Sequence, residues 1–307
     1  MEYVLRTFEL SKKYGSKWAL KNVNMNIERG DIYGFVGENG SGKTTIIRLI
    51  TGLIFQNSGK FELFGVSDSS TEMLKARKKV GAIVESPSIY LNMSAKENLK
   101  MQCDILGIKD TEKIKAVLAE VGLGDLYNDK KRSGNFSLGM RQRLGIAMAL
   151  LGDPEFIILD EPMNGLDPAG IVDIRELIIR LNKERNITFL ISSHILTELA
   201  LVATKYGIIS KGTIIKEITA AQLKNECRSW VLIEAADRDA LLDALSEFVS
   251  ESDVVPTPQG ARVYGDIDLN DILDRIIKKD IRITSINSAQ SSIEDYYLEL
   301  VGGAHHA

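Results

Sequence analysis

The sequence predicts an α/β fold whose mainly parallel sheet carries a glycine-rich loop, with an inserted helical subdomain and a small C-terminal α+β domain. Three observations lead to this prediction. Apolar strand candidates alternate with helix candidates over residues 1–220, which is typical of a parallel sheet covered by helices. Residues 94–151 have helical character throughout. Residues 221–307 follow the ferredoxin-like order β-α-β-β-α-β, with one further helix. We therefore expect two domains, 1–220 and 221–307, with the helical subdomain at about 86–152.

The chain begins with strand candidates. Tyr3–Leu10 and Val23–Ile27 read as short strands, with a turn at Gly15 between them. Ile32–Val36 is a compact apolar run between two glycines, which indicates a buried strand. Helical character follows over Thr44–Leu53, so the chain runs from a strand through a glycine loop into a helix.

Capping signals divide the middle of the chain into further elements. Ser94 and Glu97 form a capping box that opens the first helix of the inserted block. Asp110 is the expected cap of a second helix, which ends before Gly122. The other expected elements are strands at Val80–Glu85, Phe156–Leu159 and Thr188–Ser192, a helix from Ser137 to Leu151, and a helix capped by Asp167-Pro168 that ends at Leu181.

The C-terminal domain has shorter periodic segments. Gln259-Gly260 is the expected turn of its central hairpin. The expected strands are 229–234, 252–256, 261–264 and 281–286, and the expected helices are 238–249, 268–278 and a final helix at Ser292–Leu300.

The composition restricts the class of protein. Of 307 residues, 44% are hydrophobic and 26% are charged, which is ordinary for a globular protein with a core. The net charge of -4 argues against nucleic acid as the main partner, because binding to a phosphate backbone needs excess Lys and Arg. Cys103 and Cys227 are far apart and in no metal-binding spacing, which favours a reducing cytosol over a disulfide framework.

No segment of the sequence predicts membrane insertion. The first ten residues are too polar for a signal peptide, and no stretch approaches the roughly 18 apolar residues needed to cross a bilayer. We therefore expect a chain that does not itself span a membrane, although it could still dock on one. His305 and His306 are interpreted as part of a terminal tail rather than as metal ligands.

The segment GENGSGKT, residues 37–44, fits the phosphate-binding pattern G-x-x-x-x-G-K-S/T. Its glycines let backbone N–H groups curl around a phosphate, and the following helix points its positive end at the same anion. Lys43 supplies a positive charge between the β- and γ-phosphates, and Thr44 offers a hydroxyl to Mg²⁺. The alternative is a chance glycine turn, against which the preceding strand and following helix argue. The expected ATP-binding residues are Gly37, Glu38, Asn39, Gly40, Ser41, Gly42, Lys43, Thr44 and Thr45.

Two carboxylates follow the apolar run Phe156–Leu159. Asp160 and Glu161 stand where a metal-holding Asp and a water-activating Glu are expected at the end of a strand. Acidic residues are also common at exposed strand ends, so the pair alone is moderate evidence. Together with the phosphate loop it indicates nucleotide hydrolysis.

In this order, the motifs resemble the nucleotide-binding subunit of an ABC transporter, a P-loop NTPase, over about residues 1–220. Tyr14 is similar to the aromatic residue that stacks on adenine, the alternative being a half-buried strand tyrosine. Residues 136–140, FSLGM, stand where the family has its LSGGQ signature. Residues 164–167, NGLD, resemble the D-loop, and Ser193-His194 closes an apolar strand as the family's switch histidine does.

The resemblance implies a role for each of these residues. Glu161 is the general base that activates the attacking water, a contribution typically worth about 10²–10⁴-fold. His194 hydrogen-bonds the γ-phosphate and helps to hold that water. The implied Mg²⁺ ligands are Thr44, Glu85 and Asp160.

The resemblance also implies partners. Ser137, Gly139 and Asp167 would contact the ATP held by a second copy of the chain, so that ATP joins two subunits as a sandwich dimer. An integral-membrane permease would dock where the Q-loop at Glu85 meets the helical subdomain. The chain would then lie on the cytoplasmic face of the membrane, with no nucleic acid partner.

Two motifs depart from the family pattern. Leu138 and Met140 replace Gly and Gln of the signature, while Ser137 and Gly139 are kept, so we expect activity. Glu85 replaces the usual Q-loop Gln. This Glu, the following SPSIYLNMSAKENL and the C-terminal SSIEDYYLELVGG resemble exporters of the bacitracin and lantibiotic self-immunity group. Alternatively, Glu85 is a tolerated exchange without subgroup meaning.

The leading hypothesis is an ATP-hydrolysing subunit that powers a separate permease exporting a peptide antibiotic or drug. The second is a soluble ABC ATPase acting on ribosomes or DNA, but such proteins usually carry two cassettes, a coiled coil or basic extensions. A P-loop kinase or GTPase is the third, and the FSLGM segment and His194 argue against it. The C-terminal domain has no catalytic motif, and we expect it to be regulatory or to stabilise the dimer.

Overall fold

The computed structural model describes residues 2–227, 230–250, 253–265, 269–279, 281–289 and 293–303. His305, His306 and the expected element starts at 229, 252, 268 and Ser292 lie outside the described residues. The chain forms two compact units, Met1–Ala220 and Ala221–Ala307.

A six-stranded sheet forms the centre of the first unit, with the order β10-β9-β3-β8-β7-β6. All neighbours from β9 to β6 run parallel, and β10 is antiparallel to β9. β3, β7 and β8 are buried at every residue, as their nearly continuous apolar sequences require. The α/β prediction is confirmed. The strands are β3 Ile32–Val36, β6 Val80–Ile83, β7 Phe156–Asp160, β8 Thr188–Ser193, β9 Lys205–Ser210 and β10 Thr213–Thr219.

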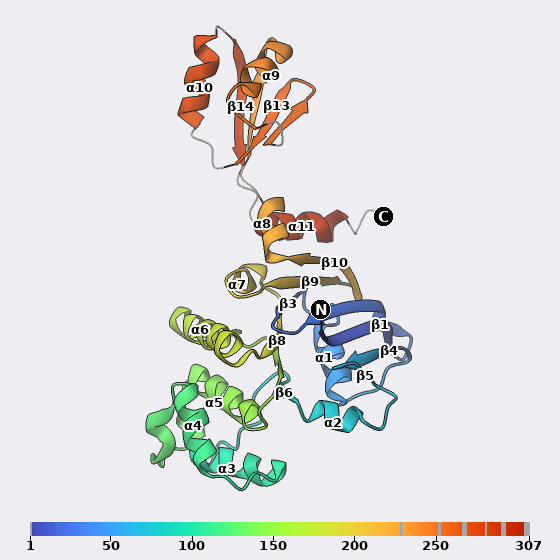
Figure 1. Cartoon of the computed structure of the whole chain (residues 1–307), viewed down its shortest axis with the longest axis vertical. Coiled ribbons are helices and arrows are strands. Elements are labelled where there is room, and N and C mark those ends of the chain that lie inside the picture. The colour runs from blue at the N-terminus through green and yellow to red at the C-terminus, as the bar shows by residue number, and fades with distance from the viewer. Residues whose placement is uncertain are drawn as a thin grey trace. The chain divides into compact units, whose positions relative to one another are not determined.

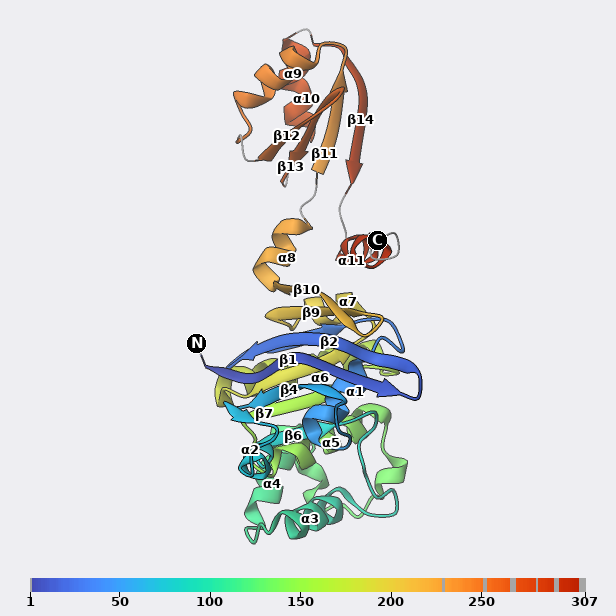
Figure 2. The same ribbon diagram turned by 90° about the vertical axis from the view of Figure 1, so that its right-hand side faces the viewer.

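The N-terminal strands form a separate antiparallel sheet of order β2-β1-β4-β5, seen across the front of the unit in Figure 2. The prediction of short strands here was wrong, because β1 (Tyr3–Tyr14) and β2 (Lys17–Glu28) each have 12 residues. Shifts in the register between β1 and β2 interrupt the alternation of apolar and polar residues, so the sequence pattern does not show how long these strands are. β4 (Ser58–Leu63) and β5 (Val66–Ser67) were not predicted.

One helix joins the two sheets into a single core. α1 (Lys43–Thr51) buries Ile46, Ile47 and Ile50 in a cluster that also contains residues of β1, β3 and β7. In Figure 1, α1 lies on one side of the parallel sheet, and α5 and α6 lie on the other. The phosphate-loop helix is therefore fixed by burial along its length.

The helical subdomain gathers at one end of the first unit, in green in Figure 1. It contains α3 Ala95–Leu106, α4 Glu112–Glu120, α5 Leu138–Leu150 and the 3₁₀ turns Gly124–Tyr127 and Ser133–Asn135. The capping box is confirmed: Ser94 Oγ accepts the Glu97 N–H at 3.3 Å, and Glu97 accepts the Ser94 N–H at 2.7 Å. The cap of α4 is Thr111 rather than Asp110, whose carboxylate instead accepts the Glu112 N–H across a local turn.

α6 (Pro168–Arg185) begins as predicted, with the Asp167 carboxylate accepting the Gly170 N–H at 3.1 Å. It ends later than expected, at a left-handed Asn186. The apolar spacing stops at Leu181, and a polar last turn carries the helix four residues further. The short helices α2 and α7 span Met73–Arg77 and Leu196–Ala200.

The second unit contains an antiparallel sheet of order β12-β13-β11-β14. Apolar residues of α9 and α10 share one core with β11 and β13. The hairpin turn falls at Pro258 and Gln259, not at Gln259-Gly260, because Gly260 is needed inside β13, where a Cβ would lie 1.9 Å from the Ile233 carbonyl oxygen. The elements are α8 Ala220–Glu226, β11 Trp230–Ala235, α9 Arg238–Ser246, β12 Val254–Thr257, β13 Gly260–Tyr264, α10 Leu269–Lys278, β14 Ile283–Ala289 and α11 Ile293–Gly303.

Within the described ranges, none of the helices combines the length and the apolar character that crossing a bilayer requires.

Candidate active site

The loop between β3 and α1 depends on its glycines. A Cβ on Gly37 would lie 2.5 Å from the carbonyl oxygen of Ile209, and one on Gly42 would lie 2.7 Å from Leu20. Gly40 and Gly42 also adopt positive φ angles of 81° and 116°. Residues 38–40 form the exposed tip of the loop, and Thr45 is the third residue of α1.

Lys43 is the first residue of α1, and it is only 5% exposed. Its ammonium donates to the Gly37 carbonyl at 2.6 Å and lies 3.2 Å from Glu161 Oε1. A buried ammonium needs such partners, because desolvation penalises an isolated charge. The neighbouring Ser41 hydroxyl is buried without a hydrogen-bond partner in the described protein, so this polar pocket can still accept a bond from or donate one to a ligand.

Thr44 on α1 and Asp160 at the end of β7 are hydrogen-bonded to each other. The Thr44 hydroxyl donates to Asp160 Oδ2 at 2.9 Å, and Asp160 is only 2% exposed. The other carboxylate oxygen accepts from Ser192 Oγ at 2.5 Å, since Ser192 is its register partner on β8. These hard oxygen atoms are suitable ligands for Mg²⁺.

Ser192 is a site residue that the sequence reasoning missed. Besides holding Asp160, its hydroxyl accepts the backbone N–H of Glu161 at 2.9 Å. Its signal in the sequence is a polar residue inside the apolar run of β8, a position that is fully buried. Buried hydroxyls are normally hydrogen-bonded, so this serine could have been searched for partners at the ends of neighbouring strands.

Glu161 connects the phosphate loop to His194. One carboxylate oxygen pairs with Lys43, and the other lies 2.7 Å from Nδ1 of His194. An ionised carboxylate only accepts, so Nδ1 carries the hydrogen. The backbone of Glu161 has a positive φ of 50°, a left-handed conformation that non-glycine residues rarely adopt. The structure therefore brings Lys43, Glu161 and His194 into one cluster.

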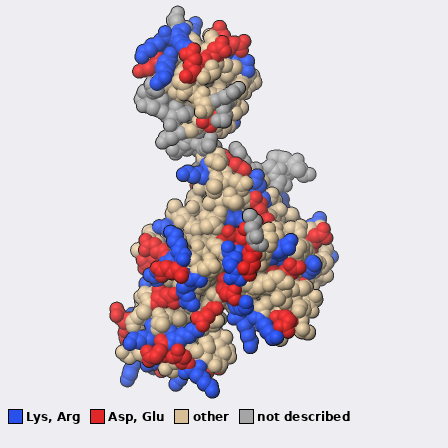
Figure 3. Space-filling model, viewed as in Figure 1, with Lys and Arg blue, Asp and Glu red and all other residues tan. Residues whose placement is uncertain are grey.

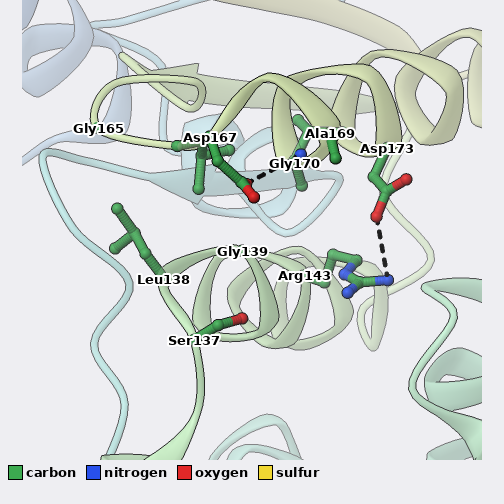
Figure 4. Close-up of a pocket in the computed structure, with 11 residues that line it drawn as sticks. Ser137, Leu138, Gly139, Arg143, Gly165, Asp167, Ala169, Gly170 and Asp173 are labelled. Carbon is green, nitrogen blue, oxygen red and sulfur yellow. Dashed lines mark hydrogen bonds and ion pairs between the residues drawn. The ribbon is translucent and has the colours of Figure 1, made fainter.

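The signature and D-loop residues line a different pocket, of about 360 Å³. In Figure 4, Ser137 and Gly139 lie at the start of α5, and Gly165 and Asp167 lie in the loop that leads into α6. Ser137 caps α5 by accepting the Met140 N–H at 3.2 Å. Among the described residues, the lining of this pocket includes none from the phosphate loop.

Tyr14 and Glu85, the remaining residues of the expected site, lie outside the cluster of Lys43, Glu161 and His194 and outside the signature pocket. Tyr14, 47% exposed, ends β1 at the hairpin, with the Lys12 ammonium 5.3 Å from its ring centre. Trp18, 45% exposed, is a second aromatic on the same hairpin that the sequence reasoning did not single out. The Glu85 carboxylate pairs with Arg48 on α1, while Thr44 and Asp160 pair with each other.

Comparisons with known proteins agree with these motifs. A family model described as ABC transporter matches residues 20–164. The bacitracin transport ATP-binding protein BcrA of Bacillus licheniformis is 41% identical over 307 residues, 99% of each chain. The lantibiotic transport ATP-binding protein SrtF of Streptococcus pyogenes is 44% identical over 70% of this chain and 90% of its own. The structure of cbiO1 from Clostridium perfringens, part of the ABC transporter complex cbiONQ, gives a TM-score of 0.66 at 27% identity, over 74% of this chain and 92% of that one.

Proposed function

The chain belongs to the ATP-binding subunits of ABC transporters, and we propose that it powers the export of a bacitracin-like or lantibiotic peptide antibiotic through a separate permease. The resemblance predicted from the motifs is confirmed, and with it the ATPase activity of the family. The observation that carries the proposed cargo is the match to a bacitracin transport protein along 99% of both chains, since it extends over both units.

The cluster around Glu161 supports a hydrolytic mechanism. ATP phosphates lie against the loop 37–42, where they replace the Glu161 carboxylate as the partner of Lys43. Glu161, still held by His194, then takes a proton from the attacking water. The water oxygen bonds to the γ-phosphorus, the bond between that phosphorus and the oxygen leaving with ADP breaks, and the products are ADP and phosphate.

Thr44 and Asp160 are the residues that would hold Mg²⁺ with the nucleotide, because both present hard oxygens at one point. The bound ion would neutralise the charge that develops on the phosphate oxygens. No group of three or more His, Cys, Asp and Glu side chains among the described residues could hold a metal by itself. This fits an ion that shares its ligands with ATP, as Mg²⁺ commonly does.

The pocket of Ser137, Gly139 and Asp167 supports a sandwich dimer. The backbone N–H groups at the N-terminus of α5 are suited to bind an anion, and none of the described residues of the chain's own phosphate loop line that pocket. We therefore propose that this pocket contacts the ATP held by a second copy. The C-terminal unit is proposed to stabilise that dimer or to regulate it.

A groove of about 870 Å³ between α2, β6, α3 and α5 is the proposed dock for the permease on the cytoplasmic face of the membrane. Its apolar lining includes Leu74, Ile105 and Leu106, which are 72%, 70% and 47% exposed. Apolar side chains exposed around one groove are typical of a site that receives an amphipathic helix.

A soluble ATPase acting on ribosomes or DNA is not favoured, since a relative that matches along 99% of both chains is a transport ATP-binding protein. Figure 3 shows acidic and basic side chains interspersed on its visible face, whereas phosphate-backbone binding calls for a concentrated basic surface.

The test is a resistance assay. The chain is expressed with the permease encoded beside it, and cells are challenged with bacitracin and with lantibiotics. We expect resistance to at least one of them, and its loss when Glu161→Gln replaces the wild type at equal abundance. Unchanged sensitivity with both proteins present would overturn the proposed cargo, while ATP turnover by the purified chain tests the ATPase separately.

A further inference from the structure

Two segments that flank different motifs are joined inside the helical subdomain. One is the segment 85–94, which begins at the Q-loop Glu85 and leads into α3. The other is the segment 133–137, which ends at Ser137, the first residue of the signature pocket. We propose that Asn98 and Ser133 are positioning residues that make these two segments move as one body, so that a displacement of Glu85 repositions Ser137.

Asn98 is the centre of this connection, and it is only 1% exposed. Its amide oxygen accepts the Tyr90 N–H at 2.8 Å. The two N–H groups of its amide nitrogen are shared among the Tyr90 carbonyl at 3.2 Å, the Ser94 carbonyl at 2.9 Å and Ser133 Oγ at 3.1 Å. A single buried side chain therefore bonds the segment before α3 and the segment before α5.

Ser133 completes the connection and is fully buried. Its hydroxyl and its backbone N–H both donate to the Met93 carbonyl at 2.8 Å. The next residue, Gly134, donates its N–H to the Leu91 carbonyl, also at 2.8 Å. Only two residues separate this anchored stretch from Ser137, so little chain is available to absorb a movement.

A second contact joins the same two elements nearer to Glu85. Pro87 packs directly on α5 at Gly145, where a Cβ would lie 2.6 Å from the Pro87 ring. Gly145 is buried, and only hydrogen at this position permits the approach. The segment 85–94 thus contacts α5 at Gly145, and Asn98 bonds it to the segment 133–137, which precedes α5.

The inference rests on the proposed function, because Ser137 matters in this way only if it reaches ATP held by a second copy. It deepens that function by giving a route from the permease-side loop to the signature pocket. ATP binding in the chain's own phosphate loop does not depend on Asn98, because the side chain of Asn98 is hydrogen-bonded to Tyr90, Met93, Ser94 and Ser133 and to no residue of that loop.

The experiment measures ATP affinity, ATP-dependent dimerisation and turnover for Asn98→Ala in the full chain. We expect ATP affinity within about twofold of wild type, a fall in kcat of about tenfold, and weaker dimerisation in a Glu161→Gln background, since small misplacements of contact groups cost up to about 10²-fold. The matched control is Asn182→Ala. Asn182 also bridges two carbonyls, those of Gly30 and Ile187 at 2.9 and 2.8 Å, but it lies in α6 away from either segment.

The proposal is overturned if Asn98→Ala behaves like Asn182→Ala, with a lower melting temperature but unchanged turnover and dimerisation. If Asn98→Ala does not fold, Ser133→Ala and Gly145→Ala test the same connection. Ser133→Ala keeps the backbone bonds, and the new Cβ of Gly145→Ala would lie 2.6 Å from Pro87 and 3.1 Å from Ile83. Normal dimerisation in both would reject the inference. If wild type itself hydrolyses no ATP, the proposed function fails, and the inference falls with it.

Discussion

Arg48 on α1 and Glu85 after β6 form an ion pair that links the phosphate-loop helix to the Q-loop position. The resemblance of the motifs leads us to expect Gln at this position, and a neutral amide could not form this ion pair. Both side chains are largely exposed, at 39% and 61%, and such pairs contribute only about 0–1 kcal/mol to stability. The ion pair therefore has little effect on the stability of the fold, but it restricts which other groups the Glu85 carboxylate can bind.

The first prediction is that Arg48 and Mg²⁺ compete for the carboxylate of Glu85. Arg48→Met should free the carboxylate and lower the Mg²⁺ concentration that gives half-maximal turnover. Glu85→Gln should raise that concentration and alter coupling to transport, because an amide binds the cation less well than a carboxylate. ATP affinity should stay nearly unchanged in both. Magnesium titrations of ATPase activity test this, and equal midpoints in wild type and both variants would mean that Glu85 has no role at the metal.

The second prediction concerns the general base. Glu161→Gln should keep ATP binding but lower turnover by about 10²–10⁴-fold, since the amide cannot take a proton from water. ATP should then hold the chains together as a dimer that gel filtration detects. Wild-type turnover in this variant would remove Glu161 from the role of base. Glu176→Gln, on the outer part of α6, is the matched control for the same chemical change.

The third prediction concerns Ser192, which holds Asp160 and the Glu161 backbone at once. Ser192→Ala removes both bonds and should lower kcat by about tenfold, a loss equivalent to about one hydrogen bond of 1–1.5 kcal/mol. Ser192→Thr keeps the hydroxyl and should restore most of the activity. Steady-state kinetics at several Mg²⁺ concentrations measure this, and full activity of the alanine variant would contradict it.

The fourth prediction is a pH dependence of stability. The Lys79 and Arg29 side chains, each 2.8 Å from Glu155, hold the pKa of Glu155 below its usual range, with the Lys79 hydrogen bond the larger cause. A carboxyl group with a lowered folded-state pKa stabilises the protein above its unfolded pKa of about 4.3, and this contribution is lost as pH falls through the folded pKa. Glu155→Gln should cost at most about 1 kcal/mol at pH 7.

Chemical unfolding at pH 7 and at pH 3 measures this contribution. The difference between Glu155→Gln and wild type should shrink as the pH falls through the folded-state pKa of Glu155, because the protonated carboxyl group is neutral like the amide. Glu72→Gln is the control, because Glu72 makes one exposed pair with Lys75 on the short helix α2. A difference that stays constant with pH would show that the effect arises from packing instead.

The sequence predicted most of what positions the nucleotide. Apolar runs located β3, β7 and β8 because strands that are buried on both faces have little choice of residue. Capping chemistry located the starts of α3, α5 and α6, since Ser94, Ser137 and Asp167 each bond a backbone N–H of the first turn. The phosphate loop was predictable because its geometry tolerates few residues other than glycine.

Other features were set by contacts between distant segments. The separate N-terminal sheet pairs β1 with β4, about fifty residues later, and no local pattern specifies that pairing. Ser192 is hydrogen-bonded to Asp160, and Glu85 is paired with Arg48. These partners are far apart in the sequence and come together only when the strands and α1 pack, so the sequence alone does not identify them. Asn98 looks like an ordinary polar helix residue until its burial and its partners are known.

Glu85 and Glu161 follow the adjacent parallel strands β6 and β7, and both have left-handed backbones, with φ angles of 63° and 50°. Glycine relieves this kind of strain, and asparagine tolerates it better than glutamate does. Stability and turnover thus favour different residues at the same two positions. A laboratory screen for heat-resistant variants would enrich glycine or asparagine there, and its best-folded survivors would be poor ATPases. If the chain exports an antibiotic as proposed, that antibiotic would have to be present during such a selection to keep the two glutamates.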